Sequence, residues 1–234
     1  VQELLNMARA AVLEGRLDAA GPLYGQALAK ARQAKDRLGE VDALRGMGLA
    51  LTGRGDSAKG VALVNESLAI ATQIGDALGQ GRAHMTLGNE FWNRRQPFPA
   101  REQFERAIAL LRGTDDLSSL GGCLVNLGLV ETMLDTQKAD SLFLEAIPVL
   151  QRAGNKPFEA NAHIGLSNLY RQTGRNALAV APLEKALTIY REIGFKPAEA
   201  GIQLNLGLTY RNLGEKEKAL SLLEAARVAG NALK

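Results

Sequence analysis

Small residues recur along this chain at a fixed interval, and this repetition limits the folds open to it more than any other feature. The first row of small residues advances by 40 residues at each step, with one step of 39. Its members are Ala8, Gly48, Gly88, Gly128, Ser167 and Gly207. Self-similarity at such a period is typical of arrays in which one supersecondary unit stacks on the next.

Two further rows of small residues keep the same register. The second row is Ala20, Gly60, Ala100, Ala139, Ala179 and Ala219, and the third is Ala27, Ser67, Ala107, Ala146, Ala186 and Ala226. Large apolar residues lie between these rows at Tyr24, Val64, Phe104, Phe143, Leu183 and Leu223. Small and large residues at matching heights let one helix pack closely against the next. We therefore expect a single array over 1-234, with repeats at about 1-40, 41-80, 81-120, 121-159, 160-199 and 200-234.

Within each repeat, apolar residues are spaced by three and four positions, which predicts helices and an all-α class. Glycines at Gly15, Gly55, Gly174 and Gly214 mark a tight turn in the middle of the repeat, because glycine reaches positive φ at little cost. Asp36, Asp76, Asp116 and Asn155 are expected caps of the first helices. The expected first helices are 1-14, 37-53, 77-94, 117-134, 157-173 and 197-213. The expected second helices are 17-34, 57-74, 98-112, 137-153, 176-193 and 216-230.

Three irregularities fall in the middle of the chain. The step from Gly128 to Ala139 is 11 residues where the other repeats have 12, so this turn is one residue short. Arg95 stands where other repeats have the turn glycine, which predicts a turn of different construction. Pro148 lies inside an expected helix, where it removes a backbone hydrogen bond and is expected to bend the chain.

These features resemble the tetratricopeptide repeat family. In that family, leucine and glycine stand in the first helix with an aromatic residue three positions later, and alanine, a large apolar residue and alanine stand in the second. The segment Leu206-Gly207 with Tyr210, followed by Ala219, Leu223 and Ala226, matches this pattern closely, and the 40-residue unit is similar to the extended type of repeat. The resemblance implies a right-handed α-α superhelix (solenoid) of six helix-turn-helix repeats, with first helices lining a concave face.

Composition and motifs argue against several functional classes. The net charge is +3, and 28 basic residues are interspersed with 25 acidic ones, so nucleic acid is an unlikely partner. His84 and His163 stand two repeats apart, too far to share a metal or an active site. We expect that the chain is not an enzyme and that it binds no metal and no cofactor. Cys123 is expected to be a buried packing residue. No wholly apolar run of about 18 residues is present, which predicts a cytoplasmic chain without a membrane span.

The resemblance also gives candidate binding residues when first-helix positions are projected onto the concave face of the family. They are Arg82, Asn89, Trp92, Asn93, Asn126, Asn161, Asn168, Arg171, Asn205, Arg211 and Asn212. Met85 falls at another of these positions. Amides both donate to and accept from a peptide backbone, and arginine binds carboxylates in a fork geometry. The alternatives stay open: each asparagine could be solvated surface, and Trp92 could pack against a neighbouring helix instead of anchoring a partner.

Three functions remain open on the sequence alone. The first is a non-catalytic scaffold that binds a protein or peptide segment in its groove. The second is a ligand-sensing or peptide-sensing regulatory module of a larger bacterial protein; Val1 falls at the start of the repeat frame, as expected of an array cut in register from a longer chain. The third is self-association, giving a homo-oligomer through the apolar ends of the array.

Overall fold

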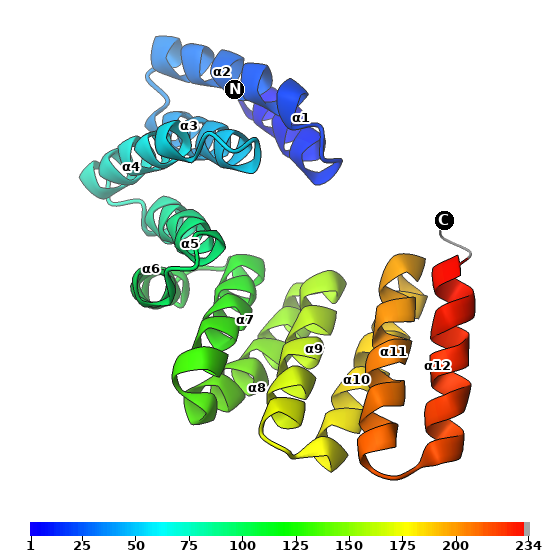
Figure 1. Cartoon of the computed structure of the whole chain (residues 1–234). Coiled ribbons are helices and arrows are strands. Elements are labelled where there is room, and N and C mark those ends of the chain that lie inside the picture. The colour runs from blue at the N-terminus through cyan, green and yellow to red at the C-terminus, as the bar shows by residue number, and fades with distance from the viewer. Residues whose placement is uncertain (232–234) are drawn as a thin grey trace. The chain divides into compact units, whose positions relative to one another are not determined.

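The computed structural model of the chain describes residues 1–231, and this range contains twelve α-helices and no strand (Figure 1). The first helices of the repeats are α1 (Gln2–Leu13), α3 (Arg37–Gly53), α5 (Ala77–Asn93), α7 (Leu117–Leu134), α9 (Lys156–Gln172) and α11 (Lys196–Asn212). The second helices are α2 (Leu17–Ala34), α4 (Ser57–Gln73), α6 (Pro97–Leu111), α8 (Thr136–Ala153), α10 (Asn176–Glu192) and α12 (Lys216–Asn231). The all-α class and the six helix-turn-helix repeats are confirmed, and each expected helix end lies within one residue of the observed one.

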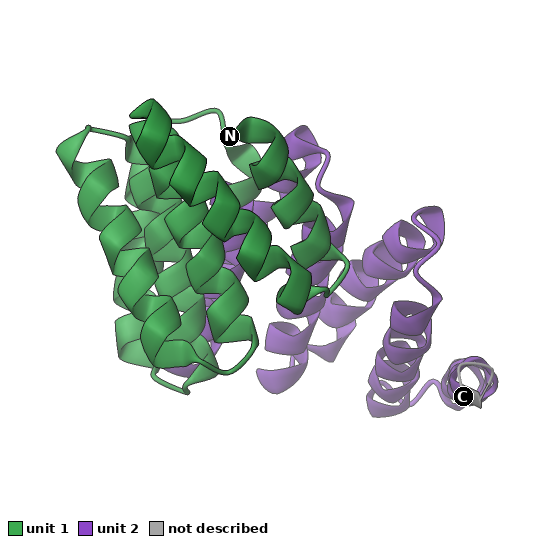
Figure 2. Ribbon diagram, turned by 90° about the horizontal axis from the view of Figure 1, so that it is seen from above, with its two compact units in different colours: residues 1–119 green, residues 120–234 purple. Residues whose placement is uncertain are grey.

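The helices form two compact units, which we call unit 1 (Val1–Ser119) and unit 2 (Leu120–Lys234) (Figure 2). Unit 1 holds α1 to α6 and the first residues of α7, and unit 2 holds the remainder of α7 and α8 to α12. The single array over 1-234 stays a prediction.

The rows of small residues lie where two helices of one repeat come into contact. A Cβ atom added to Gly48 would lie 2.7 Å from the carbonyl oxygen of Gly60, and a Cβ added to Gly60 would lie 2.7 Å from the carbonyl oxygen of Gly48. In later repeats the aromatic or large apolar residue fills this place: a Cβ on Gly128 would meet the ring of Phe143 at 2.8 Å. The close helix contact expected from the repeat pattern is therefore confirmed.

The turns inside the repeats share one backbone conformation. Gly174 and Gly214 have φ values of +74° and +81°, in the left-handed region that glycine favours. Arg95 has a φ of +58°, so the turn of the third repeat has the same conformation without a glycine, and the expectation of a different construction is wrong. Between α7 and α8 only Asp135 intervenes, and its carboxylate accepts from the backbone N–H groups of Gln137 and Lys138, both at 3.1 Å.

The helix starts follow the expected capping pattern. The carboxylates of Asp36 and Asp76 accept from the backbone N–H three residues later, at 2.8 and 2.9 Å, and the amide oxygen of Asn155 does the same at 3.3 Å. Each of these bonds satisfies one of the N–H groups that a helix start leaves without a partner. Pro148 lies inside α8, which continues through it from Thr136 to Ala153.

Each unit has its own apolar core. In unit 1, Leu5, Tyr24 and Leu44 from three successive helices are buried together. In unit 2, Leu183, Tyr190 and Ile202 belong to one buried cluster. Within each unit, the core fixes the positions of its own first helices relative to one another.

Helix α7 is long and apolar enough to cross a membrane by length and composition, with a mean hydropathy of 1.4 over its 18 residues. More than half of this window is buried inside the protein. Glu131 is fully buried in it and pairs with Lys138 of α8 at 2.9 Å. Cys123 is also buried, as expected. We therefore interpret α7 as a core helix of the repeat fold.

Candidate binding face of the first helices

The first helices form a layer of their own within each unit. In unit 1, α1 contacts α3 and α3 contacts α5, in addition to the contacts that each makes with a second helix. In unit 2, the amide of Gln172 on α9 donates to the carbonyl of Thr132 on α7 at 3.4 Å, and Arg171 on α9 donates to Asn205 on α11 at 3.0 Å. The side of this layer that faces away from the second helices is the candidate site, and we call it the first-helix face.

The first-helix face of unit 1 contains a pocket of about 490 Å³, which we call the arginine pocket. Its lining comes from α1, α3 and α5, with Tyr24 of α2 and the residues that begin α7. The lining residues are Arg9, Val12, Leu13, Tyr24, Arg45, Leu49, Arg82, Met85, Asp116, Ser118 and Ser119. Apolar side chains thus make one part of the wall and three guanidinium groups another.

Two aspartates hold the arginines of this pocket. Arg9 donates to Asp42 at 2.7 Å, and this bond joins α1 to α3. Arg82 donates to one carboxylate oxygen of Asp116 through both Nε and Nη2, each at 2.7 Å. The other oxygen of Asp116 accepts from the backbone N–H of Ser119 at 3.1 Å. Because both aspartates are tied to arginines, the guanidinium groups of Arg9 and Arg82 are fixed in direction.

Arg45 is the most enclosed of the three arginines, with only 13% of its side chain exposed. Its nearest carboxylate is Asp42, one turn earlier on α3, at 3.4 Å from Nη2. Its Nε–H is inaccessible to solvent and has no hydrogen-bond partner. Burial lowers the pKa of Arg45, and the positive charge of Arg82 lowers it further, while Asp42 acts in the opposite direction. A buried N–H without a partner is costly, so a rotation of the Arg45 side chain that turned this group toward an acceptor in the pocket would be favourable.

Two neighbouring groups respond to the same environment. Burial raises the pKa of Tyr24, although the positive charges of Arg45 and Arg9 oppose this effect. For Asp116, burial acts to raise the pKa, but hydrogen bonds from Ser119 and the charge of Arg82 outweigh it, and the pKa lies below its usual value of 3.8. At neutral pH, therefore, Tyr24 is neutral and Asp116 is ionised.

The three arginines come from the first, second and third repeats, and each stands at an earlier position of its repeat than the one before. Arg9 follows its small residue by one position, Arg45 precedes its own by three, and Arg82 precedes its own by six. These offsets lie on one side of a helix, since they differ by three and four residues. The positions predicted from the sequence include Arg82 and Met85 but not Arg9 and Arg45. The same projection applied to the first two repeats would have found both.

The predicted binding residues all lie on first helices. Those that are exposed are Asn93, Asn161, Asn168, Arg211 and Asn212, and those that are partly buried are Arg82, Asn89, Trp92, Asn126, Arg171 and Asn205. Asn89 and Asn126 already interact with other groups of the protein. Arg82 is the member of this set that lines the arginine pocket.

In unit 2 the structure brings several predicted residues into direct contact with each other or with the fold. The bond from Arg171 to Asn205 joins two of them, and the Nε–H of Arg171 is buried without a hydrogen-bond partner. Asn161 accepts from the hydroxyl of Tyr190 on α10 at 2.9 Å. Asn161 therefore has a structural role as well, whereas Asn168 is exposed and is available to a partner.

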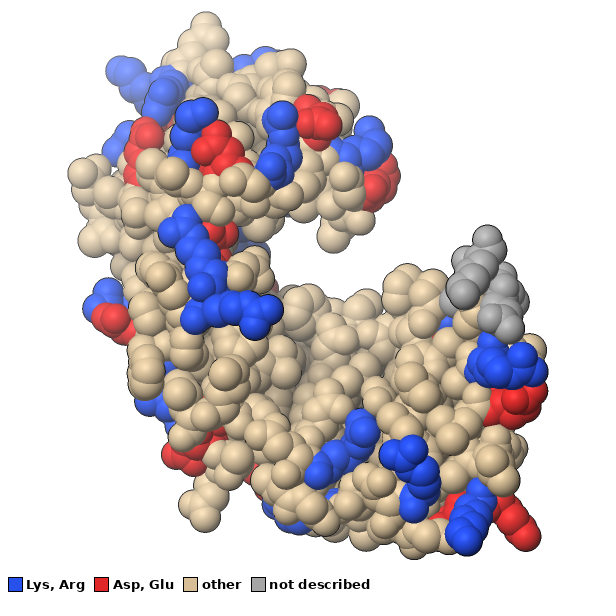
Figure 3. All heavy atoms as spheres, viewed as in Figure 1, with Lys and Arg blue, Asp and Glu red and all other residues tan. Residues whose placement is uncertain are grey.

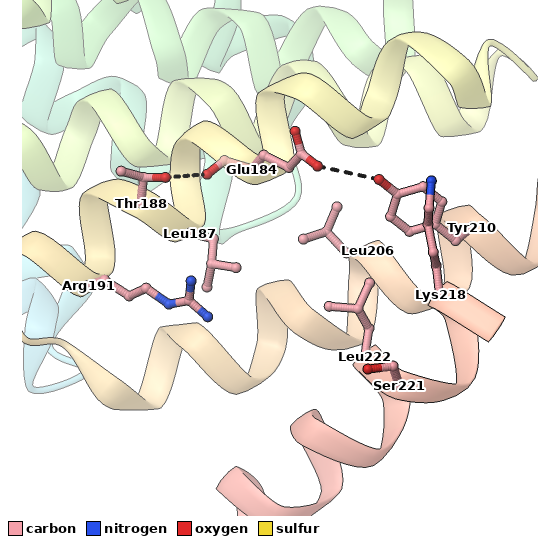
Figure 4. A pocket seen from close by; sticks show the side chains of 9 residues that line it. All are labelled: Glu184, Leu187, Thr188, Arg191, Leu206, Tyr210, Lys218, Ser221 and Leu222. Carbon is pink, nitrogen blue, oxygen red and sulfur yellow. Dashed lines mark hydrogen bonds between the residues drawn. The ribbon is translucent and has the colours of Figure 1, made fainter. Parts of the chain in front are cut away.

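A second pocket, of about 420 Å³, lies in unit 2 between α10, α11 and α12 (Figure 4). Leu187, Leu206 and Leu222 give it an apolar floor. On one side the hydroxyl of Tyr210 donates to Glu184 at 3.3 Å, and the ammonium of Lys218 stands 5.0 Å from the centre of the Tyr210 ring. None of the predicted binding residues lines this pocket.

The two histidines line neither of these pockets. His84 is buried, with its Nδ1 at 2.8 Å from the amide oxygen of Gln103, and burial lowers the pKa of His163. No three His, Cys, Asp or Glu side chains in residues 1–231 gather closely enough to hold a metal ion. On the face seen in Figure 3, basic side chains stand in small groups among acidic and uncharged residues.

The chain consists of stacked helix pairs, and the first helix of each pair carries polar side chains on the first-helix face. This arrangement is that of a helical-repeat protein. Sequence profiles described as tetratricopeptide repeat match residues 3–38, 122–192 and 200–226, which together are more than half of the chain. The chain belongs to the tetratricopeptide repeat family. No curated protein is similar enough in sequence to count as a relative.

Several solved structures share the fold at low sequence identity. BtubC (BKLC) from P. vanneervenii is 18% identical with a TM-score of 0.82, and the match covers 93% of this chain and 92% of that one. The STAND protein PH0952 from Pyrococcus horikoshii, described as having a tetratricopeptide repeat sensor, is 19% identical with a TM-score of 0.79, over 97% of this chain and 35% of that one. The quorum sensor NprR from B. thuringiensis is 14% identical with a TM-score of 0.72, over 97% and 64%. At these identities the likeness establishes the fold alone.

Proposed function

We propose that this chain is a non-catalytic scaffold in the bacterial cytoplasm that binds a segment of a partner protein on its first-helix face. One observation carries the proposal: buried arginine Nε–H groups without a hydrogen-bond partner occur on this face in both units, at Arg45 and Arg171. In a folded protein such donors are normally paired. A bound segment would supply the missing acceptors through its carbonyl or carboxylate oxygens.

The neighbouring side chains suit an extended segment. In unit 2, exposed Asn168 stands one turn from Arg171, so an amide that both donates and accepts is next to a cationic donor. Arg211 and Asn212 extend the same polar character at the end of α11. Recognition would then combine backbone hydrogen bonds along the segment with charged contacts at particular side chains.

Affinity capture from an extract of the source organism tests the proposal. Wild-type protein is compared with the double variant Asn168→Ala and Arg171→Ala, and with a matched double variant on second helices, Ser141→Ala and Lys185→Ala, which changes two exposed residues. We expect specific partners to be captured by the wild type and by the second-helix variant and lost with the first-helix variant, while circular dichroism shows that both variants keep their helical fold. Capture that survives the first-helix changes would remove the proposal.

A sensory role is a second candidate, and the structural neighbours favour it. Two proteins of similar fold are described as a quorum sensor and as containing a tetratricopeptide repeat sensor. In such a role the bound segment would be a signalling peptide, and binding would act on an attached domain. The full gene sequence tests this candidate, because a sensor requires an effector domain in the same polypeptide or in a defined partner.

Self-association remains a third proposal. Leu13 on α1 is 89% exposed, and Leu220 on α12 is 68% exposed, so helices near both ends of the chain carry apolar side chains in contact with solvent. Association of two chains that removed these side chains from water would be favourable. Sedimentation at several concentrations measures it: a mass independent of concentration at the monomer value would exclude this role.

A further inference from the structure

The arginine pocket of unit 1 has one more positive charge than its fixed groups neutralise. Three guanidinium groups meet there, and two carboxylates face them, Asp42 and Asp116. Asp42 is shared, since it lies 2.7 Å from Arg9 and 3.4 Å from Arg45. The remaining charge is therefore located at Arg45, the arginine with the longest ion pair.

The direction of hydrogen bonding leads to the same residue. Arg9 and Arg82 each have a short bond to an aspartate, whereas the Nε–H of Arg45 is buried and has no acceptor. Arg82 also repels Arg45, as the lowered pKa of Arg45 indicates. An anion paired with Arg45 would offset that repulsion, and a rotation of the Arg45 side chain would turn its Nε–H toward the anion.

The other part of the wall is apolar. Val12, Leu49 and Met85 line it, and the pocket volume of about 490 Å³ exceeds what a single carboxylate fills. Pockets of this size that combine apolar walls with a few directed polar groups are typical of ligand sites. The composition fits a ligand with a negatively charged group next to an apolar one.

We infer that the arginine pocket receives the carboxylate of an acidic residue in the partner segment, paired with Arg45, while an adjacent apolar side chain lies against Val12, Leu49 and Met85. This inference rests on the proposed function and specifies the chemistry of the segment. A single carboxylate matches the single uncompensated charge, whereas a phosphate dianion would leave the pocket with excess negative charge.

The test selects short peptides from a phage-displayed random library on the immobilised full chain. Synthetic copies of the selected peptides are then titrated by fluorescence polarisation against wild type, Arg45→Met and Arg54→Met. Met replaces a buried cation by an apolar group of similar length, and Asp42 keeps its bond to Arg9. Arg54 is a half-exposed arginine in the turn after α3 that pairs with Asp18, so its variant is the matched control.

We expect the selected peptides to contain an acidic residue beside an apolar one, and their affinity to fall about tenfold or more in Arg45→Met, as loss of a charged hydrogen bond requires. Exchange of the peptide's Glu for Gln needs no protein variant and should produce the same loss. Arg54→Met should bind as the wild type does, and circular dichroism checks that each variant is folded.

The other outcomes separate the two proposals. One outcome would overturn this inference and leave the proposed function standing. In it, the peptides keep their affinity for Arg45→Met and keep it after the Glu to Gln exchange, but they no longer bind the double variant Asn168→Ala and Arg171→Ala. Tighter binding of phosphorylated peptides than of acidic ones would also overturn it. A library that yields no binding peptide would overturn both.

Discussion

Gly48 on α3 and Gly60 on α4 approach each other so closely that a Cβ on either would lie 2.7 Å from the carbonyl oxygen of the other. Backbone atoms cannot rotate away as a side chain can. The helix pair of the second repeat therefore depends on the absence of side chains at both positions. The same contact in the fourth repeat is made between Gly128 and the ring of Phe143.

The first prediction concerns this contact. Gly48→Ala should destabilise the protein by about 1 to 3 kcal/mol, because the new methyl group forces two backbones apart. Gly25→Ala is the matched control: Gly25 lies inside α2, and a Cβ there would have no atom within 4 Å. That change should stabilise by up to about 1 kcal/mol through helix propensity. Urea unfolding measures both, and destabilisation of equal size at the two sites would contradict the account.

The second prediction concerns the turn at Arg95. Its φ of +58° places a side-chain-bearing residue in the left-handed region, at a cost of about 1 kcal/mol. Arg95→Gly should therefore raise the free energy of unfolding by about that amount. Lys35, with a φ of +56°, should behave in the same way, whereas Gln33→Gly, inside the preceding helix, should be destabilising. A loss of stability in Arg95→Gly would mean that the Arg95 side chain contributes more than its backbone strain costs.

The third prediction concerns Asp116 and pH. Its pKa in the folded state lies below the usual 3.8, so ionised Asp116 stabilises the fold above that pH, and this stabilisation is lost as pH falls through the lowered folded value. Asp116→Asn keeps a side-chain oxygen to cap α7 but removes the charge that pairs with Arg82. We expect the variant to be about 1 kcal/mol less stable at neutral pH and equal to the wild type in strong acid. A difference that persists in acid would contradict this.

The fourth prediction concerns Cys123. Its side chain is fully buried on α7. A thiol in the core of a folded repeat should react with a maleimide only when the protein opens, so labelling should be slow in buffer and complete in denaturant. Rapid labelling of the native protein would show that α7 is not packed as described.

Much of the fold followed from residue spacing, because a repeat supplies the same evidence six times. The rows of small residues fixed the helix contacts, and capping residues such as Asp36 fixed the helix starts to within one residue. The prediction for Arg95 was wrong, because the sequence shows a residue type but not its backbone conformation; local bonds from the N–H of Arg95 to Trp92 and from the N–H of Gln96 to Phe91, both at 2.9 Å, close this turn without a glycine.

The candidate site was less predictable than the fold. The choice of this side of the first helices stays a prediction, and the projection could not show that Asn161 is used by Tyr190 or that Arg82 is neutralised by Asp116. Those contacts join residues 29 and 34 positions apart in different helices. Arg45 stands at one of the projected positions in the second repeat, but its burial and its Nε–H without a partner are properties of packing that no local pattern encodes.

Photo-crosslinking measures the central claim most directly, that the first-helix face holds the partner segment. A photoreactive residue replaces Asn168 on α9 in one variant and Lys185 on α10 in another, both exposed in the free protein. On irradiation with a library-selected peptide, we predict a crosslink from position 168 and none from position 185. Crosslinking from position 185 alone, or equally from both positions, would contradict the account.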